Sequence, residues 1–221
     1  MWNLGKATLA AAALGGLIAA TPATAGDYTG DFMVRLQGTY LDPGNHSTPA
    51  GLSIDSEVLP TATLTYFLNK NIGVELFCCF AKVDADLAGA GKVADFWVFP
   101  PALTLQYHFD PISGFKPYVG AGVQYIAPFS EKGKGALAGQ HVNVDDALGF
   151  TLQAGLDIEV GQGWYLNADV KHTWIDHDVS INGAKAFNVD LDPWIFSLGL
   201  GYRFNLSDVF GSREASAAPL K

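Results

Sequence analysis

The ten residues IFSLGLGYRF, Ile195 to Phe204, decide the fold. Every second residue is large and apolar or aromatic: Phe196, Leu198, Leu200, Tyr202 and Phe204. The residues between them are mostly small or polar: Ile195, Ser197, Gly199, Gly201 and Arg203. Because successive side chains of a β-strand point to opposite faces, this period of two predicts a strand with one apolar face and one mixed face.

The same alternation recurs in seven other segments of the chain. They are residues 32–40, 61–68, 72–81, 97–109, 115–127, 148–159 and 164–173. The sequence therefore predicts eight strands. Each has about the ten residues that a tilted strand needs to cross the hydrocarbon of a bilayer.

The predicted connections alternate between short and long. Short turn-type sequences join strands two and three, four and five, and six and seven: residues 69–71, 110–114 and 161–163. Longer links, rich in Gly, Asp and Asn, join the others: residues 42–56, 84–95, 128–147 and 176–191. Outer-membrane barrels place short turns in the periplasm and long loops outside the cell. We therefore predict an all-β, eight-stranded antiparallel transmembrane β-barrel of the outer-membrane type, with both termini in the periplasm.

Charge indicates which face of each strand points inward. A charged side chain facing lipid near the middle of the bilayer costs about 2–4 kcal/mol, so the charged face must line the interior. The predicted inward charge network consists of Arg35, Glu75, Lys116, Asp157, Glu159, Asp169, Lys171 and Arg203. Tyr and Trp near the ends of the apolar faces are typical of interfacial aromatic girdles. A soluble lipocalin-type barrel would invert these faces, and periodicity alone leaves a soluble sandwich open.

The overall composition limits other classes of protein. The 221 residues are 49% hydrophobic and 16% charged, which excludes an intrinsically disordered chain. The net charge of -9 at pH 7 argues against a nucleic-acid partner. Lys6, the apolar run Ala7–Ala20 and the motif Ala23-Thr24-Ala25 predict a secretory signal peptide over residues 1–25. We expect the barrel over residues 26–204 and a periplasmic tail over residues 205–221.

Several sequence blocks resemble one family of outer-membrane proteins. In chain order they are NIGVEL (71–76), PPAL (100–103), FKPYVGAGVQY (115–125), LDPWIF (191–196) and GYRF (201–204). Through these blocks the chain resembles the outer-membrane protein W (OmpW) family. The resemblance implies a narrow, largely apolar lumen that passes small hydrophobic molecules into or across the outer membrane. It also implies outer-membrane lipid, small hydrophobic solutes and the barrel-assembly machinery as partners.

Four residues are predicted to line or constrict the lumen: Phe67, Phe77, Ile126 and Lys171. Solutes would first be captured among apolar residues of the long loops, namely Leu52, Ile54, Leu87, Leu137 and Phe187. Lys171 departs from the family's pattern because it puts a charge where an aromatic side chain is expected. It can pair with Asp157 or Glu75, and the inward charges are expected to block the lumen below the constriction.

Pro100 and Pro101 lie within one predicted strand. Because proline lacks a backbone N–H, the pair removes two ladder donors, and the strand must be bulged or locally unpaired there. The sequence leaves two interpretations open. The prolines form a simple bulge, or they mark a lateral opening from the lumen into the outer leaflet.

Two other functions remain open for such a barrel. A structural or receptor/adhesin barrel with a plugged interior would conduct nothing. A lipid-modifying enzyme would need a reactive residue facing lipid near the outer rim, for which His172 is the candidate. Inward carboxylates more often form ion pairs than acid–base pairs, and His172, Asp176, His177 and Asp178 more often form a solvated loop than a metal site. We therefore expect no enzymatic activity, no catalytic residue, no metal and no cofactor.

Overall fold

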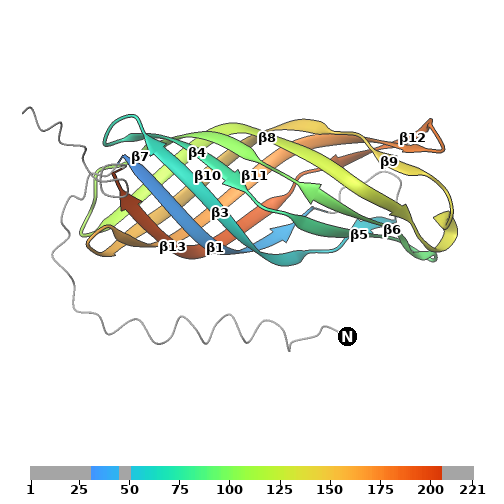
Figure 1. Ribbon diagram of the computed structural model, residues 1–221, viewed down its shortest axis with the longest axis horizontal. Helices are drawn as coiled ribbons and strands as arrows, with labels where there is room; N and C mark the ends of the chain where they lie inside the picture. The colour runs from blue at the N-terminus through green and yellow to red at the C-terminus, as the bar shows by residue number, and fades with distance from the viewer. Residues whose placement is uncertain (1–30, 45–50, 206–221) are drawn as a thin grey trace, which may run out of the picture.

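The computed structural model describes residues 31–44 and 51–205, which form mainly β-strands (Figure 1). The strands are β1 (Phe32–Asp42), β2 (Leu52–Ile54), β3 (Glu57–Phe67), β4 (Ile72–Cys78), β5 (Ala81–Leu87), β6 (Gly91–Phe99), β7 (Ala102–His108), β8 (Phe115–Gly133), β9 (Val142–Val144), β10 (Ala147–Gly161), β11 (Trp164–Ile181), β12 (Ala184–Leu191) and β13 (Trp194–Phe204). A short 3-10 helix, η1 (Gly135–Leu137), lies between β8 and β9. Among the described residues, no helix has the length and apolar character needed to cross a membrane. The predicted signal peptide and residues 206–221 of the predicted tail lie outside the described residues.

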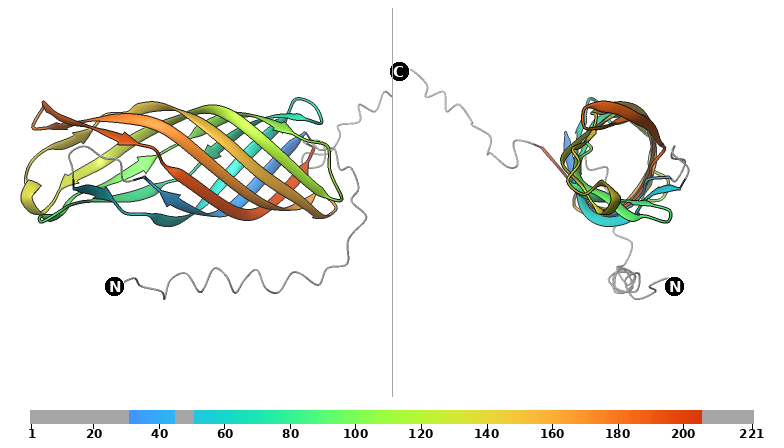
Figure 2. Two further views of the ribbon diagram at one scale, coloured as in Figure 1. Left: turned by 180° about the vertical axis from the view of Figure 1, so that it is seen from behind. Right: turned by 90° about the vertical axis from the view of Figure 1, so that its right-hand side faces the viewer.

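Eight of the described strands close into a ring. Their order around it is β1, β3, β4, β7, β8, β10, β11 and β13, and each is antiparallel to both neighbours. The ladder between β1 and β13 closes the ring, from Phe32 opposite Phe204 to Asp42 opposite Trp194. Figure 2 shows the ring end-on. A closed barrel satisfies backbone N–H and C=O groups without water, and the predicted eight-stranded antiparallel barrel is confirmed.

The predicted faces of the strands are also confirmed. On β1 the side chain of Arg35 is fully buried, whereas that of Leu36 is 67% exposed. Seven of the eight predicted inward charges are buried, and Glu159 is half-buried. Outward aromatic rings form two belts: Trp164 and Tyr202 lie 4.9 Å apart in one, and Trp174 and Trp194 lie in the other. The belts mark the limits of the membrane-spanning part of the wall.

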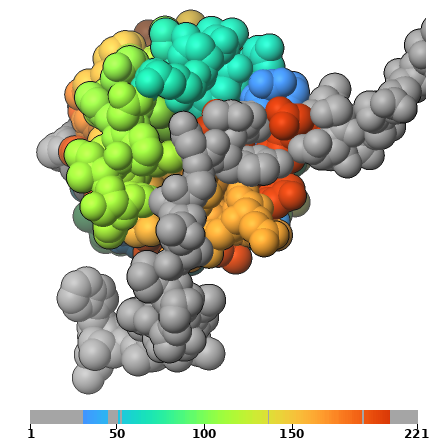
Figure 3. Space-filling model, turned by 90° about the vertical axis from the view of Figure 1, so that its left-hand side faces the viewer, coloured from blue at the N-terminus to red at the C-terminus, as the bar shows by residue number. Residues whose placement is uncertain are grey.

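The two ends of the barrel differ. At one end, short turns join β3 to β4, β7 to β8 and β10 to β11, and Figure 3 views this turn end. The described chain also begins and ends there, since the backbone N–H of Asp31 donates to the side chain of Asn205 (3.1 Å). At the opposite, extended end, the wall continues through β5, β6, β9 and β12 (Figure 1). This part lies beyond the belt of Trp174 and Trp194, since β11 runs on past Trp174 to Ile181.

The long links that the sequence predicted as loops are largely strands. They form the β5–β6 hairpin, the ends of β8 and β11, and the strands β2, β9 and β12; residues 45–50 lie outside the described residues. The loop prediction was wrong because these segments alternate too: in the link 176–191, His177 and Val179 are buried while Asp176 is exposed. Turn-type residues mark only the tips, such as Asn182 and Gly183 with φ of 52° and 80°.

Candidate functional site

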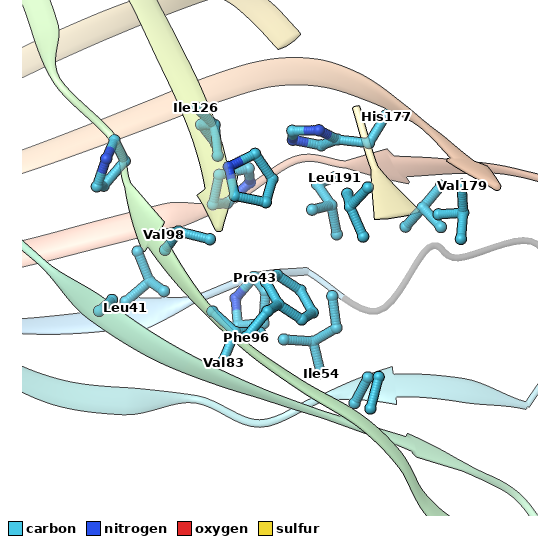
Figure 4. Close-up of a pocket in the computed structure, with 18 of the residues that line it drawn as sticks. Leu41, Pro43, Ile54, Val83, Phe96, Val98, Ile126, His177, Val179 and Leu191 are labelled. Atoms are coloured by element: carbon cyan, nitrogen blue, oxygen red, sulfur yellow. The ribbon is translucent and has the colours of Figure 1, made fainter. Parts of the chain in front are cut away.

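An apolar chamber occupies the extended end of the barrel. Its cavity volume is about 130 Å³, and Figure 4 shows side chains of several strands around it, among them Leu41, Val83, Ile126 and Val179. No Asp, Glu, Lys or Arg is among the described residues that line it, and His177 is the one titratable imidazole there. A cavity of about 150 Å³ lined by Leu, Ile and Phe binds benzene. The chamber therefore suits one small hydrophobic molecule.

The pattern of inward and outward side chains reverses where the strands pass the belt of Trp174 and Trp194. On β11, within the membrane-spanning part, Lys171 and Thr173 are buried inside the barrel, and their outward neighbours are Val170, His172 and Trp174. Beyond Trp174 the buried residues are Ile175, His177 and Val179, of which all but His177 are apolar, and the outward neighbours are Asp and Ser. Burying apolar side chains inside the barrel is favourable here, because water rather than lipid surrounds the wall and apolar surface is removed from it. This reversal builds the chamber.

Hydroxyl and amide groups form the floor of the chamber. The hydroxyl of Thr39 lies 2.6 Å from that of Thr61 and 2.8 Å from that of Ser197. The hydroxyl of Thr173 donates to the Gln124 side-chain oxygen (2.5 Å). These groups bond to one another, so the floor is a polar layer between the apolar chamber and the charges below it.

Five charged side chains meet below this floor, and we call them the ionic plug. The guanidinium of Arg35 pairs with Asp157 (Nη2–Oδ2 2.7 Å) and with Glu75 (Nη1–Oε2 3.0 Å). The ammonium of Lys171 pairs with Glu75 (Nζ–Oε1 3.3 Å) and with Asp169 (Nζ–Oδ1 2.5 Å). All five residues are at most 6% exposed, and they come from β1, β4, β10 and β11. The plug therefore joins the wall across the lumen.

Neutral side chains complete the ionic plug. The amide of Gln153 donates to Glu75 (2.9 Å) and to Asp169 (2.7 Å), and the hydroxyl of Tyr118 donates to Asp169 (2.7 Å). Tyr118 is 1% exposed and Gln153 is 4% exposed. Buried charges are tolerated when they are paired and also hydrogen-bonded, as here. Buried and bonded to one another from several strands of the ring, these side chains fill the lumen at this level.

The fit of Tyr118 in the plug can be tested at Gly155, the residue opposite it on β10. A Cβ atom at Gly155 would overlap the ring and hydroxyl of Tyr118. We expect Gly155→Ala to lower the free energy of unfolding by about 1–3 kcal/mol through overpacking, measured by urea titration in lipid vesicles. Gly38→Ala is the matched control because a Cβ there meets no atom within 4 Å. Equal stability of the two variants would contradict this account of the plug.

The predicted inward charges form two groups rather than one network. Arg35, Glu75, Asp157, Asp169 and Lys171 make the ionic plug, and of the two partners expected for Lys171 the structure shows Glu75, since Asp157 pairs with Arg35. The other three lie toward the turn end: Lys116, Glu159 and Arg203. There the Lys116 ammonium lies 5.7 Å from the centre of the Tyr165 ring, and the Arg203 guanidinium lies 3.8 Å from the centre of the Phe67 ring.

The four predicted lumen residues do not form one constriction. Phe77 and Ile126 line the chamber, and Lys171 lies beneath it with Nζ 4.9 Å from the centre of the Phe77 ring. Phe67 lies at the turn end, where it packs against Met33 and Tyr165. Its placement with the other three was wrong because it directly precedes the β3–β4 turn, on the far side of the plug.

The proline pair leaves the pairing with β8 in register. Phe99 lies opposite Ala127 and Ala102 opposite Gln124, so no residue is inserted, and the N–H of Tyr125 donates to the carbonyl of Pro101 (2.9 Å). The expected loss of pairing occurs on the other side, where the β4–β7 ladder ends at Ala102 and the β5–β6 ladder begins at Val98.

A longer unpaired stretch adjoins the prolines. The β3–β4 ladder stops at Ala62 opposite Cys78, so residues 57–61 of β3 form no described ladder on that side. Pairing resumes at β2, where Ile54 lies opposite Ala85 of β5. Cys79 and Phe80, which link β4 to β5, belong to no strand. We call residues 57–61 and 79–80 the lateral gap.

His172, the candidate for lipid chemistry, belongs to the aromatic belt. Its ring stacks on Trp194 with centroids 4.3 Å apart and meets the edge of Trp174 at 4.3 Å. Its Nδ1 lies 3.3 Å from the carbonyl oxygen of Pro193. In the part of the chain that the structure describes, no group of three or more His, Cys, Asp or Glu side chains is arranged to hold a metal ion.

Sequence reasoning missed most of the chamber wall, including His177, Val179 and Val189. A usable signal was present, because the period of two on β11 continues through Thr173, Ile175, His177 and Val179 without a break. Of the expected capture residues, Ile54, Leu137 and Phe187 do line the chamber.

Residues 29–204 match the OmpW family. The chain belongs to the OmpW family. The uncharacterized outer-membrane protein y4mB of Sinorhizobium fredii is 35% identical over 83% of this chain and 85% of that protein. Outer membrane protein W of Vibrio cholerae is 30% identical over 79% of this chain and 89% of that protein. The crystal structure of the outer membrane protein OprG from Pseudomonas aeruginosa matches with a TM-score of 0.70 and 29% identity, over 80% of this chain and 97% of that chain.

Membership of the OmpW family confirms the resemblance seen in the sequence blocks. The relatives named above are outer-membrane proteins, and the apolar outer surface of the ring between its two aromatic belts agrees with that environment. This OmpW-family chain is therefore an outer-membrane β-barrel.

Proposed function

We propose that this OmpW-family barrel is a non-enzymatic conduit that takes small hydrophobic molecules from outside the cell into the outer membrane. Its main support is the apolar chamber that lies directly above the closed ionic plug. An apolar molecule gains about 25 cal/mol for each Å² of surface removed from water, so the chamber attracts it. The plug does not bind an apolar molecule in this way, because its side chains are charged, buried and already paired with one another. Passage then leads sideways rather than along the axis.

The extended end is assigned to the outside of the cell. Outer-membrane barrels have short turns on the periplasmic side and longer extensions on the outer side. Asp31 and Asn205, where the described chain begins and ends, then face the periplasm. The assignment also puts charged outward residues such as Lys82 and Lys92 in water beyond the membrane.

The lateral gap supplies the exit. Leu59 and Cys79, which belong to the gap, and the neighbouring Pro100 all line the chamber. Strands without a ladder separate at lower cost because no backbone hydrogen bond between them is broken. Pro101 keeps its carbonyl bond to β8, and Pro100, which has no N–H, cannot extend the ladder toward β5. Outer-membrane lipid receives the solute, and the barrel-assembly machinery inserts the chain.

Uptake through the chamber is tested by placing one carboxylate on either face of β11. Val179 lines the chamber and is 7% exposed, whereas Ser180, the next residue, faces outward. A polar group buried without a partner costs about 1–3 kcal/mol, so we expect Val179→Asp to slow uptake of an apolar fluorescent solute about tenfold. Uptake is measured in proteoliposomes of the mature chain. The matched variant Ser180→Asp should behave like the wild type.

The closed plug also favours a second function, a structural or receptor barrel that conducts nothing. The same experiment separates the two functions. If the wild-type barrel migrates as folded, heat-modifiable protein yet takes up no more solute than empty vesicles, the second function stands. If Val179→Asp and Ser180→Asp slow uptake equally, the chamber is not the route.

A further inference from the structure

His177 is the polar exception in the wall of the chamber. It lies on β11 between the inward residues Ile175 and Val179, and its side chain is 2% exposed. Figure 4 shows its ring beside the apolar side chains of Leu191 and Val179. Because the other inward residues of β11 beyond Trp174 are apolar, an aliphatic residue is expected at this position. An imidazole here therefore needs a partner for each of its two nitrogens.

One nitrogen of His177 has a partner and the other has none among the described residues. Nδ1 lies 3.0 Å from the backbone carbonyl oxygen of Asp145, which can only accept, so Nδ1 carries the proton. Nε2 is buried without a hydrogen-bond partner within the described chain. Burial lowers the pKa of His177, against the opposing effects of the Asp145 carbonyl and the carboxylates of Asp176 and Asp146. The neutral ring then presents a lone pair at Nε2.

The two other lining side chains that carry oxygen or nitrogen atoms, Thr39 and Gln124, already have hydrogen-bond partners within the barrel. The Thr39 hydroxyl bonds with Thr61 and Ser197. The Gln124 amide donates to the carbonyl of Pro100 (3.3 Å), and its oxygen accepts from Thr173. Among the described lining residues, His177 is thus the one whose side chain keeps a nitrogen or oxygen atom without a hydrogen-bond partner.

We propose that Nε2 of His177 accepts a hydrogen bond from the hydroxyl group of the bound solute, so that the chamber selects small phenols and alcohols over hydrocarbons of the same shape. This inference rests on the proposed function, since it names the class of molecule that the chamber takes. A single substituted ring agrees with the cavity volume of about 130 Å³. Carboxylates are excluded because no lysine or arginine is among the described lining residues.

Selection of this kind follows from buried hydrogen bonding. An apolar pocket discriminates weakly between a hydroxyl and a methyl group, but a pocket with a buried acceptor rejects the analogue that leaves the acceptor unpaired. One such bond to a neutral group changes affinity by about five- to tenfold. Phenol and toluene are the appropriate pair because they differ by a hydroxyl against a methyl group.

The test compares uptake of phenol and of toluene into lipid vesicles that contain the full mature chain, with uptake by empty vesicles subtracted. We expect the wild type to favour phenol about five- to tenfold and His177→Phe to abolish the preference by slowing phenol alone. His177→Gln, which restores an acceptor oxygen, should recover part of it. His141→Phe is the control because His141 is exposed outside the chamber.

Each outcome is decisive. If His177→Phe slows phenol and toluene equally, or leaves the preference intact, the inference is overturned while the conduit stands. If the folded wild type takes up neither compound faster than empty vesicles, the proposed function itself fails. Heat-modifiable migration shows that each variant is folded, and His177→Gln provides the comparison should His177→Phe not fold.

Discussion

Replacing Arg35 with methionine is expected to lower the free energy of unfolding of the barrel by about 3–5 kcal/mol. Arg35 is fully buried and bonds Asp157, Glu75 and the hydroxyl of Thr65. Removing it leaves the Asp157 carboxylate without its cation and leaves Glu75 with Lys171 alone. An uncompensated buried charge is among the most destabilising changes a protein can undergo. Urea titration of the folded protein in lipid vesicles measures the loss.

Two further variants show whether charge is the cause. The triple variant Arg35→Met, Glu75→Gln, Asp157→Asn removes both carboxylates with their cation and should regain much of the lost stability. Lys70→Ala breaks the exposed pair with Asp110 at the turn end (3.2 Å) and should leave the midpoint unchanged. If Arg35→Met unfolds with the same free energy as the wild type, the ion pairs of the plug contribute nothing to the stability of the barrel.

Locking the lateral gap is expected to reduce uptake to the level of empty vesicles. Ala62 and Cys78 are the last pair of the β3–β4 ladder, so the next positions, Thr61 and Cys79, face each other at the edge of the gap, and both are buried. Thr61→Cys in a Cys78→Ala background leaves one cysteine on each side. Because both native cysteines are free thiols, oxidation can then form a new disulfide between β3 and the β4–β5 link.

The redox state supplies the control for the locked barrel. Oxidised protein, verified by thiol titration, should lose uptake of the apolar solute, and reduction of the same sample should restore it. This reversal removes the effect of the substitutions themselves, including the lost bond between Thr61 and Thr39. Full uptake by the oxidised form would place the exit elsewhere in the wall.

The fold was predictable because one physical rule governs the membrane-spanning wall. Lipid outside and packed polar groups inside force the period of two, so Arg35 and Leu36 fall on opposite faces in sequence and structure alike. The extended end was not predictable by that rule. There water lies outside, and segments such as 84–95 carry glycines and acidic residues that indicate loops although they continue as strands.

The candidate site was predictable in part. Each inward charge could be assigned to a face, but pairing across the lumen depends on strand tilt and stagger, which the period does not contain. Hence Lys171 could be matched with two carboxylates and Phe67 was grouped with the wrong end. The sequence does not predict a buried His177, because it predicts residues 176–191 to be a loop, where a histidine is expected to be exposed to solvent.

Closure of the ring between β1 and β13 has a consequence for how the chain matures. Phe32 meets Phe204 and Asp42 meets Trp194, so the seam joins the two extremes of the described barrel. A nascent chain that stops before Trp194 leaves an entire row of main-chain amides and carbonyls of β1 facing hydrocarbon, at several kcal/mol for each orphaned group. Stable insertion of the ring therefore requires the final segment, because only β13 can pair with this edge of β1.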